Sequence, residues 1–138
     1  MAENTAGRLY GLRLSSAWPL HGSLAPAHGA PDVEFIEGDA SAFVDAPMSA
    51  PHGSSDWFFR SEFKDGSTYL RWTDLFEFIV SPDGKRITCR ALAHASQENF
   101  QTYLLGQVLS FSLLKQGWEP LHATTIAVGD VAVGLMGD

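Results

Sequence analysis

The sequence predicts an α+β protein in which an antiparallel, aromatic-rich β-sheet is followed by one long buried helix and two closing strands. Three observations carry this prediction. Short strand-like segments separated by Gly, Pro and Asp fill about the first ninety residues, and apolar residues then recur at helical spacing over residues 96–116. The end of the chain is apolar and carries one tight turn. A content of 45 % apolar and 18 % charged residues agrees with a globular domain.

Residues 1–94 are predicted to form a β-rich accessory region. Alternation predicts strands over residues 10–14 and 33–37. Between and after them, segments 18–31 and 45–56 are rich in Pro, Gly and Ser and are expected to be loops, the second being the better candidate for a mobile segment.

A meander of aromatic strands is expected next, at residues 56–63, 68–72, 75–80 and 85–91. Asp65-Gly66 and Ser81-Pro82-Asp83-Gly84 are favourable turn sequences between them. The aromatics are expected to form a sheet core, and a ligand groove is the alternative: Trp57, Phe58, Phe59, Tyr69, Trp72, Phe76 and Phe78. Cys89 is expected in the core, whereas Glu62, Asp74 and Glu77 are expected to face solvent from their strands.

The helix over residues 96–116 has clear ends. Ser96 suits the N-cap, Gly117 suits the left-handed position after the last turn, and Pro120 blocks continuation. Leu105, Leu109 and Leu113 make a second apolar face in addition to the main one. A helix that is apolar on two faces is expected to be sandwiched between two layers.

The closing segment predicts two strands, residues 121–128 and 131–136, joined by a turn at Gly129-Asp130. The second strand is a continuous apolar run, as expected of a strand buried on both faces. Left uncovered, it would expose an apolar surface and an unpaired edge. We therefore expect residues 131–136 either to pack under the helix or to pair with another copy of the chain.

Charge and composition exclude several classes of partner. Nine Lys and Arg oppose sixteen Asp and Glu, and the net charge of −7 without any basic run argues against nucleic acid and anionic membrane surfaces. No signal-peptide pattern or membrane-spanning stretch is expected, and the single cysteine allows no internal disulfide, so a cytoplasmic location is predicted. No metal site is expected, because four of the histidines are scattered without ligand spacing: His21, His28, His52 and His94.

The end of the chain carries the candidate chemistry. An apolar strand running into Gly137-Asp138 is similar to the strand that precedes a phosphate-binding P-loop, Gly-x-x-x-x-Gly-Lys-Ser/Thr, whose backbone N–H groups cradle phosphates. Gly137 would be the first glycine and Asp138 a variable position, both in the nucleotide-binding loop. The lysine would lie beyond residue 138. Strands ending in glycine are common, so an ordinary turn glycine is the alternative.

A wider pattern resembles the HPr kinase/phosphorylase-like family. It comprises Leu104-Leu105-Gly106-Gln107-Val108-Leu109, then Gly117, then Pro120-Leu121-His122-Ala123, then two strands ending in Gly137-Asp138. The resemblance is close over residues 96–138 and loose before them, where Tyr10–Leu14 and Pro31–Glu34 look like the β-rich leader of shorter members.

The resemblance implies that residues 95–138 are the helix and first strands of an incomplete P-loop kinase domain. The whole protein would then transfer a phosphoryl group from ATP with Mg²⁺ to a serine of a phosphocarrier-like protein or peptide, with homo-oligomers suggested. His122 matches the family histidine beside the phosphate loop and is the candidate catalytic residue; a histidine satisfying a backbone carbonyl is the alternative. Lacking the lysine, this chain would be inactive and bind no nucleotide tightly. A stand-alone β-rich ligand- or protein-binding module without catalysis is the other hypothesis.

Overall fold

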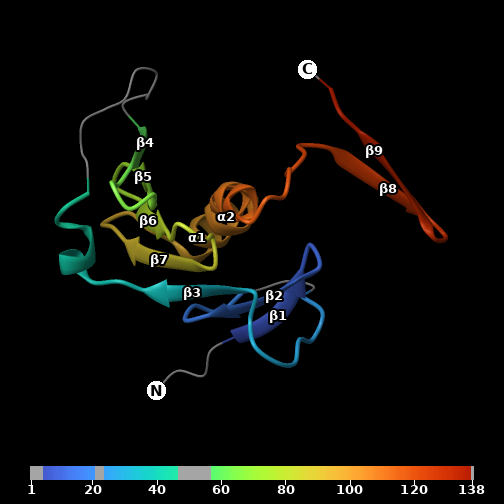
Figure 1. Cartoon of the computed structure of the whole chain (residues 1–138), viewed down its shortest axis with the longest axis horizontal. Coiled ribbons are helices and arrows are strands. Elements are labelled where there is room, and N and C mark those ends of the chain that lie inside the picture. The colour runs from blue at the N-terminus through green and yellow to red at the C-terminus, as the bar shows by residue number, and fades with distance from the viewer. Residues whose placement is uncertain (1–4, 21–23, 47–56, 138) are drawn as a thin grey trace.

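The computed structural model describes residues 5–20, 24–46 and 57–137 of the chain. Seven strands form one sheet, three helical segments run on as a single helix, and the last two strands form a separate hairpin (Figure 1). The elements in chain order are β1 (Thr5–Leu9), β2 (Leu12–Ser16), β3 (Val33–Glu37), the 3₁₀ turn η1 (Ala40–Phe43), β4 (Phe58–Glu62), β5 (Thr68–Trp72), β6 (Phe76–Val80), β7 (Arg86–Ala91), α1 (Gln97–Tyr103), the π-helical turn η2 (Leu104–Val108), α2 (Leu109–Lys115), β8 (Thr124–Val128) and β9 (Val131–Leu135). The predicted α+β class is confirmed.

The large sheet has the strand order β1-β2-β3-β7-β6-β5-β4. Strands β4 to β7 form the expected antiparallel meander. β3 lies between β2 and β7 and is parallel to both, an arrangement that the sequence did not predict. Parallel neighbours require a long connection rather than a tight turn, and residues 17–32 provide one between β2 and β3.

The first expected strand is wrong in one detail. Tyr10 and Gly11 form the two-residue turn between β1 and β2, with φ of 51° and 79°, instead of lying inside a strand. Positive φ at both central positions belongs to the turn type whose twist matches that of paired strands. The alternating pattern therefore covers the end of one strand and the start of another.

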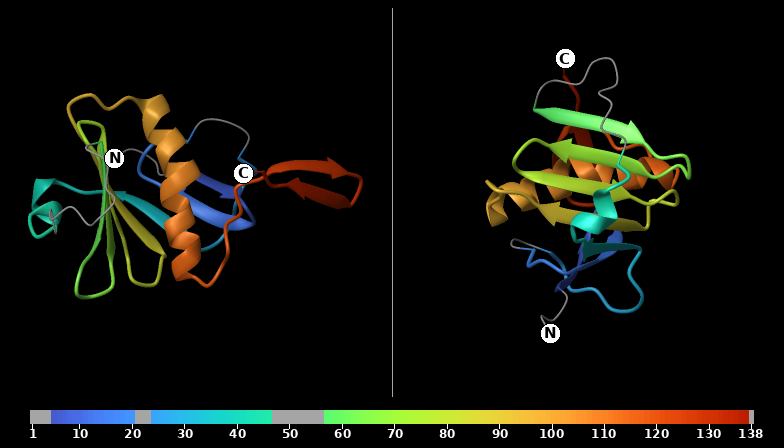
Figure 2. Two further views of the ribbon diagram at one scale, coloured as in Figure 1. Left: turned by 90° about the horizontal axis from the view of Figure 1, so that it is seen from above. Right: turned by 90° about the vertical axis from the view of Figure 1, so that its left-hand side faces the viewer.

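One face of the sheet is apolar and carries the helix, as Figure 2 shows from the side. Trp72, Phe76 and Phe78 are almost fully buried and contact Phe100 and Tyr103 of α1 through ring pairs with centroids 4.9 to 6.4 Å apart. Each buried side chain of this size stabilises the fold by about 1.5–3 kcal/mol. The prediction that the strand aromatics form a core is confirmed for these residues, and Cys89 is likewise buried.

The opposite face of the sheet holds a buried carboxylate, that of Glu77, which was predicted from the sequence to face solvent. Glu77 is 2 % exposed, accepts a hydrogen bond of 2.7 Å from the hydroxyl of Tyr69 and pairs with Arg90. Burial and this hydrogen bond raise the pKa of Tyr69. η1 covers this face, and Phe43 lies against the guanidinium of Arg90. The expectation failed because alternation predicts which face a residue occupies, not that a second layer covers that face.

Polar contacts fix the end of the helix on two turns of the sheet. The Ser112 hydroxyl and the Gln116 side-chain amide both donate to the carbonyl of Gly84, at 2.5 and 3.2 Å. Lys115 donates to the carbonyl of Gly66 at 2.6 Å. The helix therefore shares one core with the β-rich region, and the expected boundary between residues 94 and 95 falls inside this packed unit.

The closing hairpin projects away from the sheet and helix (Figures 1 and 2). The Gly129 turn lies where the sequence placed it, and the two strands lie within the expected ranges, although β8 begins only at Thr124. The expectation that residues 131–136 pack under the helix is wrong, because every residue of β8 and β9 is exposed. Pairing of this strand with another copy of the chain stays a prediction. The hairpin therefore does not form a second layer over the helix, although Leu109 of the second apolar face is fully buried in the core. Within the described residues, no helix is long and apolar enough to cross a membrane.

The contact of Gly84 with the helix generates a stability prediction. A Cβ at Gly84 would overlap the backbone carbonyl oxygen of Ser112, and its φ of 71° strains any other residue. Gly84→Ala should lower the free energy of unfolding by more than 2 kcal/mol, measured by urea denaturation, because overlap adds to the roughly 1 kcal/mol cost of a left-handed residue.

Gly11→Ala is the matched control, since its φ is 79° and nothing lies within 4 Å of the added Cβ. Gly11→Ala should lower the free energy of unfolding only by the cost of placing alanine in a left-handed backbone conformation. Equal destabilisation by the two substitutions would contradict the proposed docking of the helix on the turn.

Candidate functional site

A groove of about 580 Å³ lies beside the second apolar face of the helix, next to the segment that leads into the hairpin. Three parts of the chain line it: the β1–β2 turn, the exposed side of η2 and α2, and the linker between α2 and β8. Its described lining residues are Tyr10, Leu105, Gly106, Leu109, Ser110, Leu113, Trp118, Glu119, Pro120, Leu121, His122, Ala123 and Thr125. Small-molecule sites have volumes of this order.

The second apolar face of the helix supplies the floor of the groove. Leu105, Leu109 and Leu113 follow one another at intervals of four residues, which places them on one side of the helix. The sequence correctly distinguished this face and assigned it to the interior. Leu109 is fully buried in the core, whereas Leu105 and Leu113 are partly buried against the core and border the groove.

The helix is irregular where it meets the groove. Leu104–Val108 form a π-helical turn, a form that is rare and occurs frequently at functional sites. Gly106 lies inside this turn, and a Cβ there would meet no atom within 4 Å. Glycine in a helix interior costs about 1 kcal/mol relative to alanine. No described packing contact requires glycine at this position.

The end of the helix places Trp118 at one rim. The N–H of Gly117 donates to the carbonyl of Leu114 at 3.1 Å, and the N–H of Trp118 donates to that of Leu113 at 2.9 Å. This pair of bonds is a Schellman motif with the glycine in the left-handed position, at φ 83°. Trp118 nevertheless remains 62 % exposed, so the motif holds a large aromatic side chain largely in solvent beside the groove.

Tyr10 lines the groove from the β1–β2 turn. It is 67 % exposed and has a φ of 51°, in a turn position where Asn, Asp or Gly is usual. A bulky residue with positive φ costs about 1–2 kcal/mol, and such strain clusters at functional sites.

An ion pair anchors the strand that follows this turn. The carboxylate of Asp32 accepts from the guanidinium of Arg13 at 2.7 and 3.0 Å and from the backbone N–H of Arg13 at 2.8 Å. The N–H of Asp32 in turn donates to the carbonyl of Arg13 at 2.8 Å. These hydrogen bonds lower the pKa of Asp32 well below its usual range. They tie β2 to the start of β3 and so help to position Tyr10.

Two of the three predicted site residues lie at the same end of the hairpin. Thr124 pairs with Leu135, so His122 precedes one strand and Gly137 follows the other at the end nearer the helix. Ala123 continues beside β9, where a Cβ at Gly134 would lie 3.8 Å from that of Ala123. His122 is exposed and lines the groove. Asp138 lies outside the described residues.

Neither backbone geometry nor packing explains the glycine at position 137. Its φ is outside the left-handed range, and nothing lies within 4 Å of an added Cβ. Gly129, in contrast, has a φ of 58° that its turn requires. A glycine that packing does not require permits a ligand to approach the backbone closely.

The charges of the groove suit only part of a nucleotide. Its described lining includes one carboxylate, Glu119, and no lysine or arginine. Elsewhere in the described part of the chain, no group of three or more His, Cys, Asp or Glu is arranged to hold a metal ion. These residues therefore fit a neutral, flat group and do not fit phosphates or Mg²⁺.

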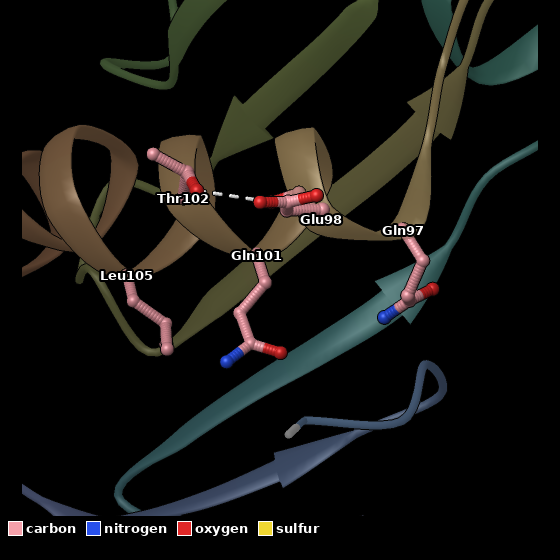
Figure 3. A pocket seen from close by; sticks show the side chains of 5 residues that line it. All are labelled: Gln97, Glu98, Gln101, Thr102 and Leu105. Carbon is pink, nitrogen blue, oxygen red and sulfur yellow. Dashed lines mark hydrogen bonds between the residues drawn. The ribbon is translucent and has the colours of Figure 1, made fainter. Parts of the chain in front are cut away.

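A second hollow, of about 550 Å³, lies along the first half of the same side of the helix. Figure 3 shows its described lining, which comes from the helix alone: Gln97, Glu98, Gln101, Thr102 and Leu105. The Thr102 hydroxyl donates to the carbonyl of Glu98 at 2.9 Å, and the side-chain amide of Gln97 donates to the carbonyl of Pro19 at 2.6 Å. Because the Thr102 hydroxyl and the Gln97 amide already donate to backbone carbonyls, the groove beside the linker is the better candidate site.

The sequence did not identify Tyr10, Gly106 and Trp118 as site residues. Each carries a local signal: a tyrosine in a turn pair, a glycine at the centre of a helical pattern and a tryptophan just after the helix-ending glycine. Nothing in the order of residues indicates that the three converge. Comparison of the chain with protein-family models, curated proteins and solved structures finds no match.

The ion pair beside the Tyr10 turn generates a prediction of pH dependence. Because folding lowers the pKa of Asp32, its contribution to stability is present above the unfolded-state pKa, near 4, and is lost as the pH falls below that value. Asp32→Asn should be less stable than the wild type at pH 7. The difference in urea midpoint should shrink steadily between about pH 4 and pH 2.

Asp130→Asn, in the exposed hairpin turn, controls for the loss of one negative charge. A constant difference between wild type and Asp32→Asn across this pH range would show that the carboxylate does not act through its charge.

Proposed function

We propose that residues 1–138 form the N-terminal part of an ATP-dependent protein serine kinase of the HPr-kinase-like class, acting in the cytoplasm. In this proposal β1 to β7 and the helix form an accessory unit. β8 and β9 are the first strands of the P-loop nucleotide domain, and the phosphoryl acceptor is a serine of a protein or peptide.

One observation carries the proposal. The register of β8 and β9 brings His122 and Gly137 to the same end of the hairpin, and His122 lines the groove. This is the arrangement that a phosphate loop following Gly137, with a histidine beside it, would have. The turn end of the hairpin, at Gly129, points away from the body, and the opposite end is the one that the linker joins to α2 (Figure 1).

The surface of the hairpin gives a second, independent support. Six large apolar side chains of this segment are more than half exposed: Ile126, Val128, Val131, Val133, Leu135 and Met136. A two-stranded hairpin alone is marginally stable in water, and an apolar surface of this kind marks a contact with further protein. Additional strands and helices of a nucleotide domain would cover both faces.

Without the loop lysine, the 138 residues should not transfer phosphate. ATP and Mg²⁺ are implied for the larger protein, where the loop lysine and the metal would neutralise the phosphates. The role of His122 would be to hold a hydrogen bond or a proton beside them.

The reading frame after codon 138 tests this proposal directly. We expect it to continue with Ser-Gly-x-Gly-Lys-Ser/Thr, and a native stop codon or an unrelated continuation would refute the proposal. In the protein that includes this loop, His122→Ala should lower the phosphoryl-transfer rate about 100-fold, the contribution typical of a positioned acid or base. His94→Ala, at an exposed histidine before α1, should leave the rate unchanged.

A further inference from the structure

We propose that the groove between the helix and the linker holds the neutral, planar base of a nucleotide, with Trp118 and Tyr10 as its aromatic rims. This inference rests on the proposed function, because it assigns the part of the nucleotide that the phosphate loop does not bind. It adds a binding site formed by the accessory unit itself.

Three departures from local structural preference meet at this groove. They are the left-handed φ of Tyr10, the glycine at position 106 in the helix interior, and the π-helical turn around it. Such departures are expected where a site needs a particular shape, since elsewhere the sequence would favour regular structure. Of the described residues, none packs closely enough on Gly106 to require glycine there, and the space beside it is open.

The chemistry of the lining selects a flat, uncharged ligand. The partly exposed Leu105 and Leu113 provide apolar surface, and the exposed rings of Tyr10 and Trp118 provide surfaces on which a base can stack. The described lining has no lysine or arginine to neutralise phosphate groups inside the groove.

The polar groups of the groove suit an amino-bearing base. The carboxylate of Glu119 accepts from an exocyclic amino group. The Ser110 hydroxyl donates to the carbonyl of Gly106 at 3.0 Å, which leaves its oxygen able to accept. Adenine combines a stacking surface with an amino group. Placing it here would direct the remainder of the nucleotide toward His122 and Gly137 at the adjoining end of the hairpin.

Titration of the 138-residue chain with adenosine, followed by ligand-observed NMR and tryptophan fluorescence, tests the inference. We expect binding in the millimolar range, and ATP with Mg²⁺ should bind no more than about twofold more tightly, because the phosphates find no lysine. Cyclohexanol, an apolar but non-planar probe, should bind at least tenfold more weakly. Absence of adenosine binding, or equal binding of cyclohexanol, would overturn the assignment of a base.

Two variants locate the site. Trp118→Leu should weaken adenosine binding about tenfold through the loss of one stacking surface, whereas Trp57→Leu, at another exposed tryptophan, should have no effect. Gly106→Leu should abolish binding by filling the groove while it leaves the unfolding midpoint unchanged or raises it, since leucine favours a helix over glycine. Binding that survives both Trp118→Leu and Gly106→Leu would refute the inference.

The outcomes separate this inference from the proposed function. If adenosine binds in the groove but the reading frame contains no phosphate loop, the base site stands and the kinase proposal fails. If the longer protein binds ATP tightly and Trp118→Leu does not alter the affinity, the kinase proposal stands and the base site is refuted.

Discussion

The packing of one helix on the aromatic face of the sheet is the interaction on which the rest of the structure depends. Trp72, Phe76 and Phe78 lie beneath Phe100 and Tyr103, and each aromatic pair adds about 0.5–1.5 kcal/mol beyond the burial of its surface. The polar contacts of the last turn with Gly84 and Gly66 fix how far along the sheet the helix ends. The chain therefore leaves the body at a defined place, and the linker and hairpin begin there.

The groove is a consequence of that packing. The helix buries its main apolar face against the sheet, and of the second face only Leu105 and Leu113 keep part of their surface exposed beside the linker. Trp118 stays at the rim because the Schellman motif holds the backbone of the helix end, not because its ring is buried. Tyr10 reaches the same groove from a strand pair whose position depends on the ion pair between Arg13 and Asp32. Side chains more than a hundred residues apart in sequence thus line one surface.

The hairpin illustrates how an apolar sequence can lie outside a core. Residues 131–136 have the composition of a strand buried on both faces, and in this structure they are exposed. An apolar composition indicates that a strand is stable when other parts of the protein cover it. Whether it is covered depends on the tertiary contacts that the chain can make.

Local patterns determined the elements of this protein. The Ser96 cap, the Gly117 end, the Ser81–Gly84 turn and the last two strands follow from residue types within a few positions of each other, and the structure has them where they were expected. Tertiary structure alone decided that β3 inserts in parallel between β2 and β7, that Glu77 is buried against Arg90, and that Tyr10 and Trp118 share a groove. The physical reason is that turns and caps depend on short-range hydrogen bonds and on the φ preferences of single residues. The strand order, the burial of a side chain and the meeting of distant residues in one groove depend instead on which parts of the chain pack together and exclude water.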